Sequence, residues 1–152
     1  ILVRGHADTN KVLADFVKAG LQKQVIKRTK TEAGYQYYLN GKELDLGQTP
    51  LVLKLIDNGG FDGVDPNPRE TMQAALNLSQ TRAKGVKAAL ERFAKEANVN
   101  LDVSQIQPVG VGISEPLIAR PKSPAESLKN MRVEFRIIRI SAESVKASDY
   151  DF

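Results

Sequence analysis

The sequence predicts an α/β fold, a two-layer α+β sandwich in which helices pack against one face of a small mixed β-sheet. Apolar residues recur at steps of three and four over residues 70–98, and this period indicates one long helix. Short apolar runs at residues 1–5 and 131–137 are typical of strands. An Asn-Gly pair at residues 40–41, flanked by alternating segments, indicates a β-hairpin.

The first third of the chain is expected to form a strand, a helix and the hairpin. Residues 1–5 are aliphatic and β-branched and end at a glycine, as a buried strand entering a turn does. Apolar residues at helical spacing predict an amphipathic helix over residues 10–27, with Asp8 or Thr9 as its N-cap and a lysine-rich face toward solvent. The hairpin turn falls at Asn40-Gly41, because both residues tolerate positive φ.

Two helices with clear N-terminal signals are expected next. Thr49-Pro50 opens a helix that ends near residue 58, with threonine as its cap and proline at its first position. Asn67, Pro68 and Glu70 form a close variant of the capping box and begin the long helix. The predicted buried stripe of that helix consists of Met72, Leu76, Ser79, Ala83, Val86, Leu90, Phe93 and Ala97.

Two strands are expected to complete the domain. Residues 106–112 form a glycine-punctuated strand, and residues 131–137 alternate apolar and charged side chains, the pattern of a half-exposed antiparallel strand. A loop or short helix joins them, and residues 141–152 are expected to be a C-terminal tail.

Composition limits the classes of function. The chain has 152 residues, of which 41% are hydrophobic and 26% charged, with a net charge of +4 and no cysteine. Disulfide scaffolds, thiol nucleophiles and zinc-thiolate sites are therefore excluded. No apolar stretch is long enough for a membrane span. The charge suits an anionic partner but is far short of the basic stripe of a nucleic-acid-binding protein, so no nucleic acid is expected.

Sequence patterns for catalysis or metal binding are lacking. The single histidine, His6, has no accompanying Gly-x-Ser-x-Gly elbow and is interpreted as a hydrogen-bonded turn residue. The acidic, glycine-rich loop at residues 57–67 does not have the spacing of a calcium-binding loop. Gly110-Val111-Gly112 does not open a nucleotide-binding helix. We therefore expect no enzymatic activity, no cofactor and no metal site.

Asp8 and Arg82 are the charged residues that point to a binding site. Asp8 follows the first strand, at a corner where a helix begins, and Arg82 lies about 100° round the long helix from its buried stripe. A carboxylate and a guanidinium in one groove can clamp a zwitterion, since one accepts from an ammonium and the other binds a carboxylate bidentately. The alternative interpretations are that Asp8 only caps the helix and that Arg82 only forms a surface ion pair.

Four motifs, in this order, resemble the OmpA-like C-terminal domain family, which includes peptidoglycan-associated lipoproteins and flagellar stator proteins. The motifs are Gly5-His6-Ala7-Asp8, residues 78–90 with Leu78-Ser79 and Arg82-Ala83, residues 109–116 with Gly110-Val111-Gly112, and residues 130–134. The resemblance implies non-covalent peptidoglycan binding through the diaminopimelate residue of the stem peptide. It also implies a place in the periplasm or cell envelope, with association to the outer membrane as one option.

The resemblance further implies which residues bind. By motif position, Asp8 and Arg82 would hold the ammonium and carboxylate of diaminopimelate. Ala7 and Thr9 would line the pocket through their backbone, and Leu78 would pack beside it. Arg132, in the last motif, completes the predicted binding set.

The chain also departs from the family pattern. Ala75 stands where the family has asparagine, and Met131 stands where it has arginine, so two polar groups are lost. Residues 9–68 stand where a typical member has a short link, and they are expected to form a helix-hairpin-helix insertion. The expected organisation is an OmpA-like domain over residues 1–140 with this insertion, followed by the tail.

The family fold begins with a strand and a helix before Gly-His-x-Asp, and neither is in this chain. The opening Ile1-Leu2-Val3 is typical of the middle of a strand, so we expect a piece of a longer protein, such as the C-terminal end of a substrate-binding-protein/OmpA fusion. The alternative function is an envelope protein–protein interaction or assembly module, which keeps the fold without binding the wall and contacts a protein partner through the insertion.

Overall fold

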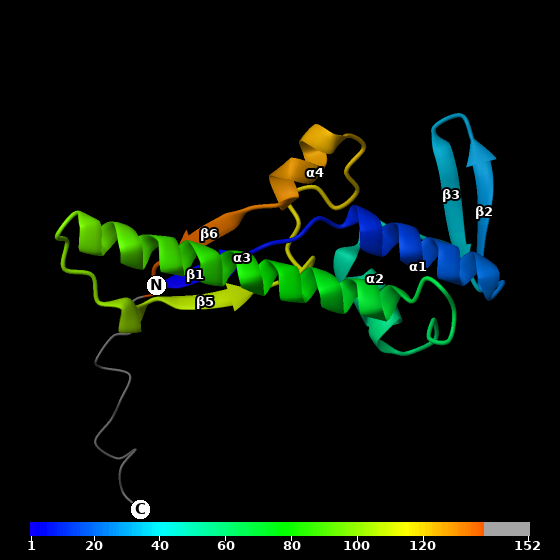
Figure 1. The fold of residues 1–152 in the computed structure, drawn as a ribbon. Coiled ribbons are helices and arrows are strands. Elements are labelled where there is room, and N and C mark those ends of the chain that lie inside the picture. Colours follow the sequence, from blue (N-terminus) through cyan, green and yellow to red (C-terminus); the bar gives the residue numbers. More distant parts are fainter. Residues whose placement is uncertain (139–152) are drawn as a thin grey trace, which may run out of the picture.

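The computed structural model describes residues 1–138, which form a mixed α/β structure with four α-helices and two three-stranded sheets (Figure 1). The predicted tail, residues 141–152, lies outside the described residues. The elements in chain order are β1 (Leu2–Gly5), α1 (Asn10–Gln22), β2 (Ile26–Thr31), β3 (Gly34–Leu39), β4 (Lys42–Leu44), α2 (Thr49–Asp57), α3 (Pro68–Glu96), a 3₁₀ turn (Val103–Gln105), β5 (Gln107–Gly110), α4 (Pro124–Asn130) and β6 (Val133–Arg136).

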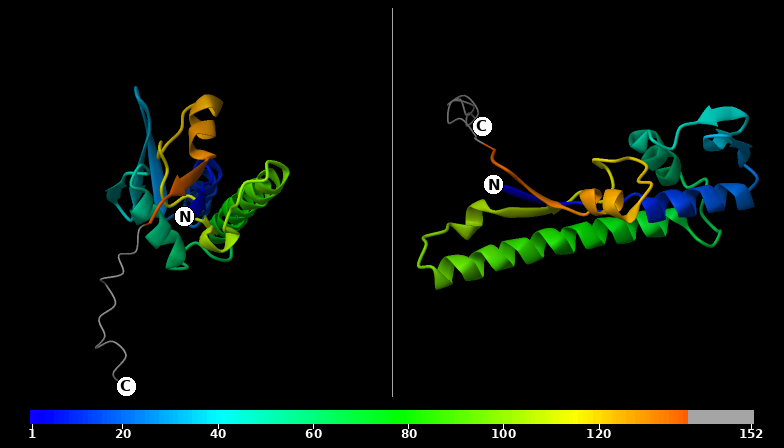
Figure 2. Two further views of the ribbon diagram at one scale, coloured as in Figure 1. Left: turned by 90° about the vertical axis from the view of Figure 1, so that its left-hand side faces the viewer. Right: turned by 90° about the horizontal axis from the view of Figure 1, so that it is seen from above.

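One sheet joins the two ends of the described chain. Its order is β5-β1-β6, with β1 parallel to β5 and antiparallel to β6, so it is the small mixed sheet that the sequence predicts. The C-terminal half of α3 covers one face of this sheet, as Figures 1 and 2 show. Val3, Ala83 and Ile106 form a small core between helix and sheet.

The long helix crosses β1 at a glycine. A Cβ atom at Gly5 would overlap the carbonyl oxygen of Ser79, so at this point the two backbones meet directly. The Ser79 hydroxyl accepts a hydrogen bond of 2.9 Å from the backbone N–H of Gly112 and fixes the turn after β5 to the same place on α3. A Cβ atom at Gly110 would likewise overlap the backbone of Gln80, so Gly5 and Gly110, from two of the predicted motifs, allow the close packing of α3 on the sheet.

The larger core lies in the region predicted as an insertion. The second sheet, order β2-β3-β4, is antiparallel and stands between α1 and α2 in the chain. Phe16 and Phe61 pack with their ring centroids 4.7 Å apart, and they belong to one apolar cluster with Val52 and Ile56. Both α1 and α2 contact α3 near its N-terminal end, so α3 connects the two cores.

The predicted hairpin is confirmed, but its sheet has one more strand than expected. Asn40 and Gly41 have φ values of 50° and 81°, as a tight turn between β3 and β4 requires. The predicted helix over residues 10–27 is too long, because α1 ends at Gln22 and Gln24, with φ 59°, turns the chain into β2. The region that the sequence predicts to be an insertion therefore contains a helix, a three-stranded sheet and a helix, rather than a helix-hairpin-helix.

The starts of the other helices are close to those expected. The N-cap of α2 is Gln48 rather than Thr49. Asn67 caps α3 as predicted, because its side-chain oxygen accepts a hydrogen bond of 3.0 Å from the backbone N–H of Arg69. The predicted stripe is wrong at Leu76, which is exposed, and near its end, where Phe93 is 65% exposed and Ala94 is buried instead.

Within residues 1–138, no helix combines the length and the apolar character that a membrane crossing requires.

Candidate functional site

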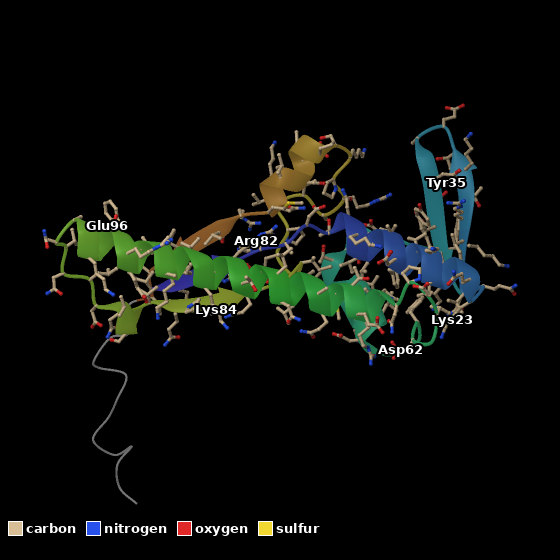
Figure 3. All side chains as sticks on the ribbon, viewed as in Figure 1. Lys23, Tyr35, Asp62, Arg82, Lys84 and Glu96 are labelled. Atoms are coloured by element: carbon tan, nitrogen blue, oxygen red, sulfur yellow. The ribbon has the colours of Figure 1, made fainter. Side chains whose placement is uncertain are left out.

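A pocket of about 280 Å³ lies where β1 ends, between α1 and α3. Asp8, from the segment after β1, and Arg82, from the middle of α3, both line it. Figure 3 labels Arg82 on α3. The full lining is Ala7, Asp8, Lys11, Val12, Thr71, Ala74, Ala75, Leu78, Arg82 and Met131.

Arg82 is fixed to the end of the first strand. Its Nη1 donates a hydrogen bond of 3.0 Å to the backbone carbonyl of His6. A guanidinium carries five N–H donors, so four remain for a ligand or for water once this contact is made. This contact is its single hydrogen bond to the described part of the chain, and no ion pair with those residues neutralises its charge.

Asp8 is held by two donors. Its Oδ2 accepts from the backbone N–H of Asn10 at 3.3 Å, at the start of α1, and its Oδ1 accepts from Nδ2 of Asn130 at 3.0 Å. Asn130 is fully buried at the end of α4, and its Oδ1 accepts from the backbone N–H groups of Leu117 and Ile118. Asp8 thus binds the first N–H of α1 and also lines the pocket.

Four of the six predicted binding residues line this pocket, and two do not. Ala7 is buried in its wall, and Leu78 is half exposed at its rim. Thr9 is 1% exposed, and its hydroxyl donates to the carbonyl of Ala119 at 3.0 Å. Arg132 lies outside the pocket, where its Nε donates to Oε1 of Glu134 at 2.7 Å.

Sequence reasoning did not identify Lys11 and Thr71 as pocket residues. Lys11 forms an ion pair of 2.6 Å with Asp15, one turn along α1, and Asp15 also accepts a hydrogen bond of 2.6 Å from the hydroxyl of Thr71. The spacing of Lys11 and Asp15 was a usable signal, because residues four apart share a helix face. The pocket therefore has two cations, Lys11 and Arg82, and one lining carboxylate, Asp8.

The two departures from the family pattern also line the pocket. Ala75 lies on the same side of α3 as Leu78 and Arg82, and Met131 lies opposite, after α4. Both side chains present apolar surface to the pocket. The polar groups of the pocket are thus concentrated at Asp8, Arg82, Lys11 and Thr71.

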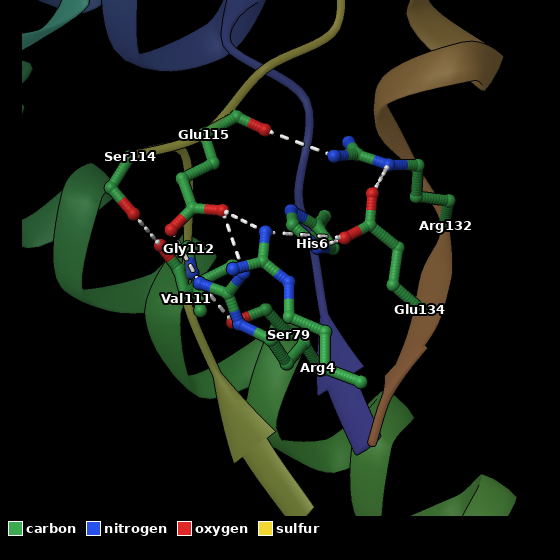
Figure 4. Close-up of polar contacts among 10 residues, drawn as sticks. Arg4, His6, Ser79, Val111, Gly112, Ser114, Glu115, Arg132 and Glu134 are labelled. Carbon is green, nitrogen blue, oxygen red and sulfur yellow. Dashed lines mark hydrogen bonds and ion pairs between the residues drawn. The ribbon is translucent and has the colours of Figure 1, made fainter. Parts of the chain in front are cut away.

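A network of charged residues lies behind the pocket, on the sheet face away from α3 (Figure 4). Arg4 alternates with Val3 and Gly5 along β1, so it points to this face, where both terminal nitrogens pair with the carboxylate of Glu115. Nη2 of Arg132 donates to the carbonyl of Glu115 at 3.2 Å. The hydrogen bond from Arg4 lowers the pKa of Glu115, and that from Arg132 lowers the pKa of Glu134.

His6 is buried within this network. Neither ring nitrogen forms a hydrogen bond with a described residue, and Nε2 lies 3.4 Å from Oε2 of Glu134. Burial lowers the pKa of His6, and the charge of Arg132 lowers it further, so the imidazole is neutral at pH 7. The interpretation of His6 as a hydrogen-bonded turn residue is therefore wrong for its side chain, because only the backbone of His6 forms hydrogen bonds with described residues. The environment fits a packing role for the imidazole, and the network around it ties β1, β6 and the loop of Glu115 together.

The pocket can recognise a small group that carries both charges. Asp8 can accept from an ammonium, while Arg82 can bind a carboxylate. No group of three histidine, aspartate or glutamate side chains in residues 1–138 is arranged to hold a metal ion. No protein-family model matches this chain, and no curated protein or solved structure is significantly similar to it.

Proposed function

We propose that this protein binds peptidoglycan non-covalently through the diaminopimelate residue of the stem peptide and anchors an envelope protein to the cell wall. The single observation that carries the proposal is that Asp8 and Arg82 line one pocket. Residue chemistry and the resemblance to OmpA-like domains both point to this pair as a clamp for a zwitterion.

The proposed contacts follow from the charges. The side-chain end of diaminopimelate is an amino-acid head with one ammonium and one carboxylate. Asp8 accepts from the ammonium, and Arg82 binds the carboxylate with donors that its contact to His6 leaves available. Lys11 also lines the pocket, but its ammonium is paired with Asp15, so Arg82 is the cation available to the carboxylate.

The size of the pocket supports a small ligand group. Its volume of about 280 Å³ is slightly below the roughly 300–1,000 Å³ of sites that enclose drug-sized ligands. It suits the head of one amino-acid side chain better than a sugar unit. The apolar surface of Val12, Ala74 and Leu78 can contact the methylene chain that carries this head.

An envelope assembly module remains the second candidate function. The observation that favours it is that Ala75 and Met131 both line the pocket where family members carry polar groups. Under this alternative the pocket binds no ligand, and the insertion built from α1, the second sheet and α2 contacts a protein partner. Neither proposal includes catalysis.

Co-sedimentation with purified cell wall tests the anchor proposal. The wild-type protein should pellet with walls whose stem peptides contain diaminopimelate and remain in the supernatant with walls that contain lysine instead. Arg82→Gln should weaken binding about 30-fold or more, since losing one partner of a desolvated charge pair costs about 2 kcal/mol or more. Arg92→Gln, which changes an exposed arginine of the same helix, is the matched control and should behave as wild type. Wild-type protein that remains in the supernatant with both kinds of wall would overturn the proposal.

A further inference from the structure

The pocket of Asp8 and Arg82 opens into a longer depression across the insertion. A second hollow, here called the connecting hollow, shares Asp8 and Met131 with the pocket and continues along α4. A third, here called the basic groove, shares Asn10 and Pro121 with the connecting hollow and runs between α1 and the second sheet. Neighbouring hollows share lining residues, so the three adjoin one another in a row, which is here called the depression.

The far end of this depression is positively charged. Lys18, Arg28 and Arg120 line the basic groove, Lys122 lines the connecting hollow, and no aspartate or glutamate lines the groove. None of these four cations forms an ion pair with another residue of the described chain. The guanidinium of Arg28 lies 4.5 Å from the ring centre of Tyr35, which holds it beside the groove. These charges therefore remain available to an anionic ligand.

The basic groove also has apolar lining residues. Leu13, Val17 and Leu21 of α1 line it together with Leu46. A lining that combines apolar side chains with cations fits a peptide whose small apolar side chains alternate with carboxylates. A bare polyanion would leave these apolar side chains without contacts.

We infer that the basic groove binds the carboxylate-bearing remainder of the stem peptide whose diaminopimelate residue occupies the Asp8–Arg82 pocket. This inference rests on the proposed function. The stem peptide has free carboxylates on its glutamate residue and at its C-terminal alanine, and its alanine methyl groups are small and apolar. Charge and continuity thus favour one ligand along the whole depression over a separate acidic partner.

The distances agree with a short peptide. Lys18 is eight positions after Asn10 on α1, or about 12 Å at 1.5 Å per residue. Diaminopimelate is the third of the four residues of the stem peptide, so two residues precede it and one follows. Two extended residues cover about 7 Å, and the diaminopimelate side chain between its head group and the backbone adds about 5 Å, which together match the distance to Lys18.

Calorimetric titration with two soluble probes tests this inference. One probe is free meso-diaminopimelate, and the other is the stem tetrapeptide L-alanyl-γ-D-glutamyl-meso-diaminopimelyl-D-alanine. The Lys18→Gln/Arg120→Gln variant removes two groove cations, and Lys84→Gln/Arg92→Gln removes two exposed cations of α3 as a matched control. Because two exposed charge contacts are lost, the groove variant should bind the tetrapeptide up to about tenfold more weakly and bind free diaminopimelate unchanged.

The outcomes separate the two proposals. If wild-type protein binds neither probe, the proposed function fails, and the groove inference fails with it. If wild-type protein binds both probes but the groove variant loses affinity for neither, or for both equally, the function stands and the inference is wrong. A groove variant that retains tetrapeptide binding but loses an acidic protein partner would assign the groove to that partner instead and would also overturn the inference.

Discussion

Asn130 donates a hydrogen bond of 3.0 Å to Asp8, although 122 residues separate the two in sequence. The same amide donates to the carbonyl of Ile118 and accepts from two backbone N–H groups. One buried side chain thus positions the carboxylate of the pocket and closes the loop before α4.

Replacing Asn130 by alanine should destabilise the protein strongly. The backbone N–H groups of Leu117 and Ile118 would lose their acceptor, and an unsatisfied buried group costs about 1–3 kcal/mol. We expect a loss of about 3 kcal/mol in the free energy of unfolding, measured by urea denaturation. Lys129→Ala, at an exposed neighbouring position, should change it by less than about 0.5 kcal/mol. Equal effects from both variants would contradict this assignment.

Alanine substitutions at two glycines should change the stability of the protein in opposite directions. At Gly5 the new methyl would overlap the Ser79 carbonyl, so Gly5→Ala should cost about 3 kcal/mol through displacement of α3. At Gly85, inside the same helix, a Cβ meets no atom within 4 Å, so Gly85→Ala should stabilise by about 0.5–1 kcal/mol. Thermal unfolding of the two variants checks both signs, and a Gly5→Ala protein as stable as wild type would refute the backbone contact.

Glu115 should make stability depend on pH in the acid range. Its pKa in the folded protein lies below the ordinary 4.5 because Arg4 donates to its carboxylate. The stabilisation is complete above about pH 4.5 and is lost as the pH falls through the lower folded pKa. Glu115→Gln should therefore unfold at lower urea concentration than wild type at neutral pH, and the two midpoints should converge in acid. A constant difference across this range would argue against the pairing.

The imidazole of His6 should titrate below its ordinary pKa of 6.5, because it is buried beside Arg132. The unfolded chain then binds the proton more readily, so stability falls as the pH drops from 6.5 toward the folded pKa. His6 is the single histidine of the chain, so its proton resonances in an NMR titration are unambiguous. The same titration in concentrated urea provides the control, with a pKa of about 6.5. A folded-state pKa above the urea value would instead indicate a charged pair with Glu134.

Ala75→Asn should strengthen binding to free diaminopimelate. Ala75 lines the pocket on the same side of α3 as Arg82, so an amide there can add one hydrogen bond to the ligand. One such bond is expected to raise affinity about three- to tenfold in calorimetric titration. Ala89→Asn, at an exposed position of the same helix, should leave affinity unchanged. No gain from Ala75→Asn would mean that this position does not face the bound head group.

Secondary structure was predicted most accurately where the sequence signal depends on residues close together in the chain. The Asn67 cap and the Asn40-Gly41 turn each depend on residues within a few positions, and both are present. Strand β2 was missed because Ile26 is its one buried residue, so its Lys, Arg and Thr side chains show no apolar alternation. The prediction that Phe93 is buried is wrong because the buried residue that follows Leu90 on α3 is Ala94, four positions later, and not Phe93, three positions later.

The sequence predicted the charged pair of the candidate site, but it did not predict the residues that hold this pair in place. Asp8 and Arg82 belong to short motifs, whereas the role of Asn130 depends on a partner that sequence spacing cannot indicate. Arg132 does not reach the pocket that its neighbour Met131 lines, because its guanidinium turns to Glu134, two residues further along the chain. Lys11 belongs to the lysine-rich face that the sequence predicts to point to solvent, and it is exposed there, although it also lines the pocket.

Helix α1 borders both ends of the depression, with Lys11 and Val12 at the pocket and Val17, Lys18 and Leu21 at the groove. Under the two proposals above, one helix sets the interval between the two binding points. The interval is set by helix rise, so four residues added within α1 would lengthen it by about 6 Å. A chain altered in this way would then require a longer ligand to reach both points.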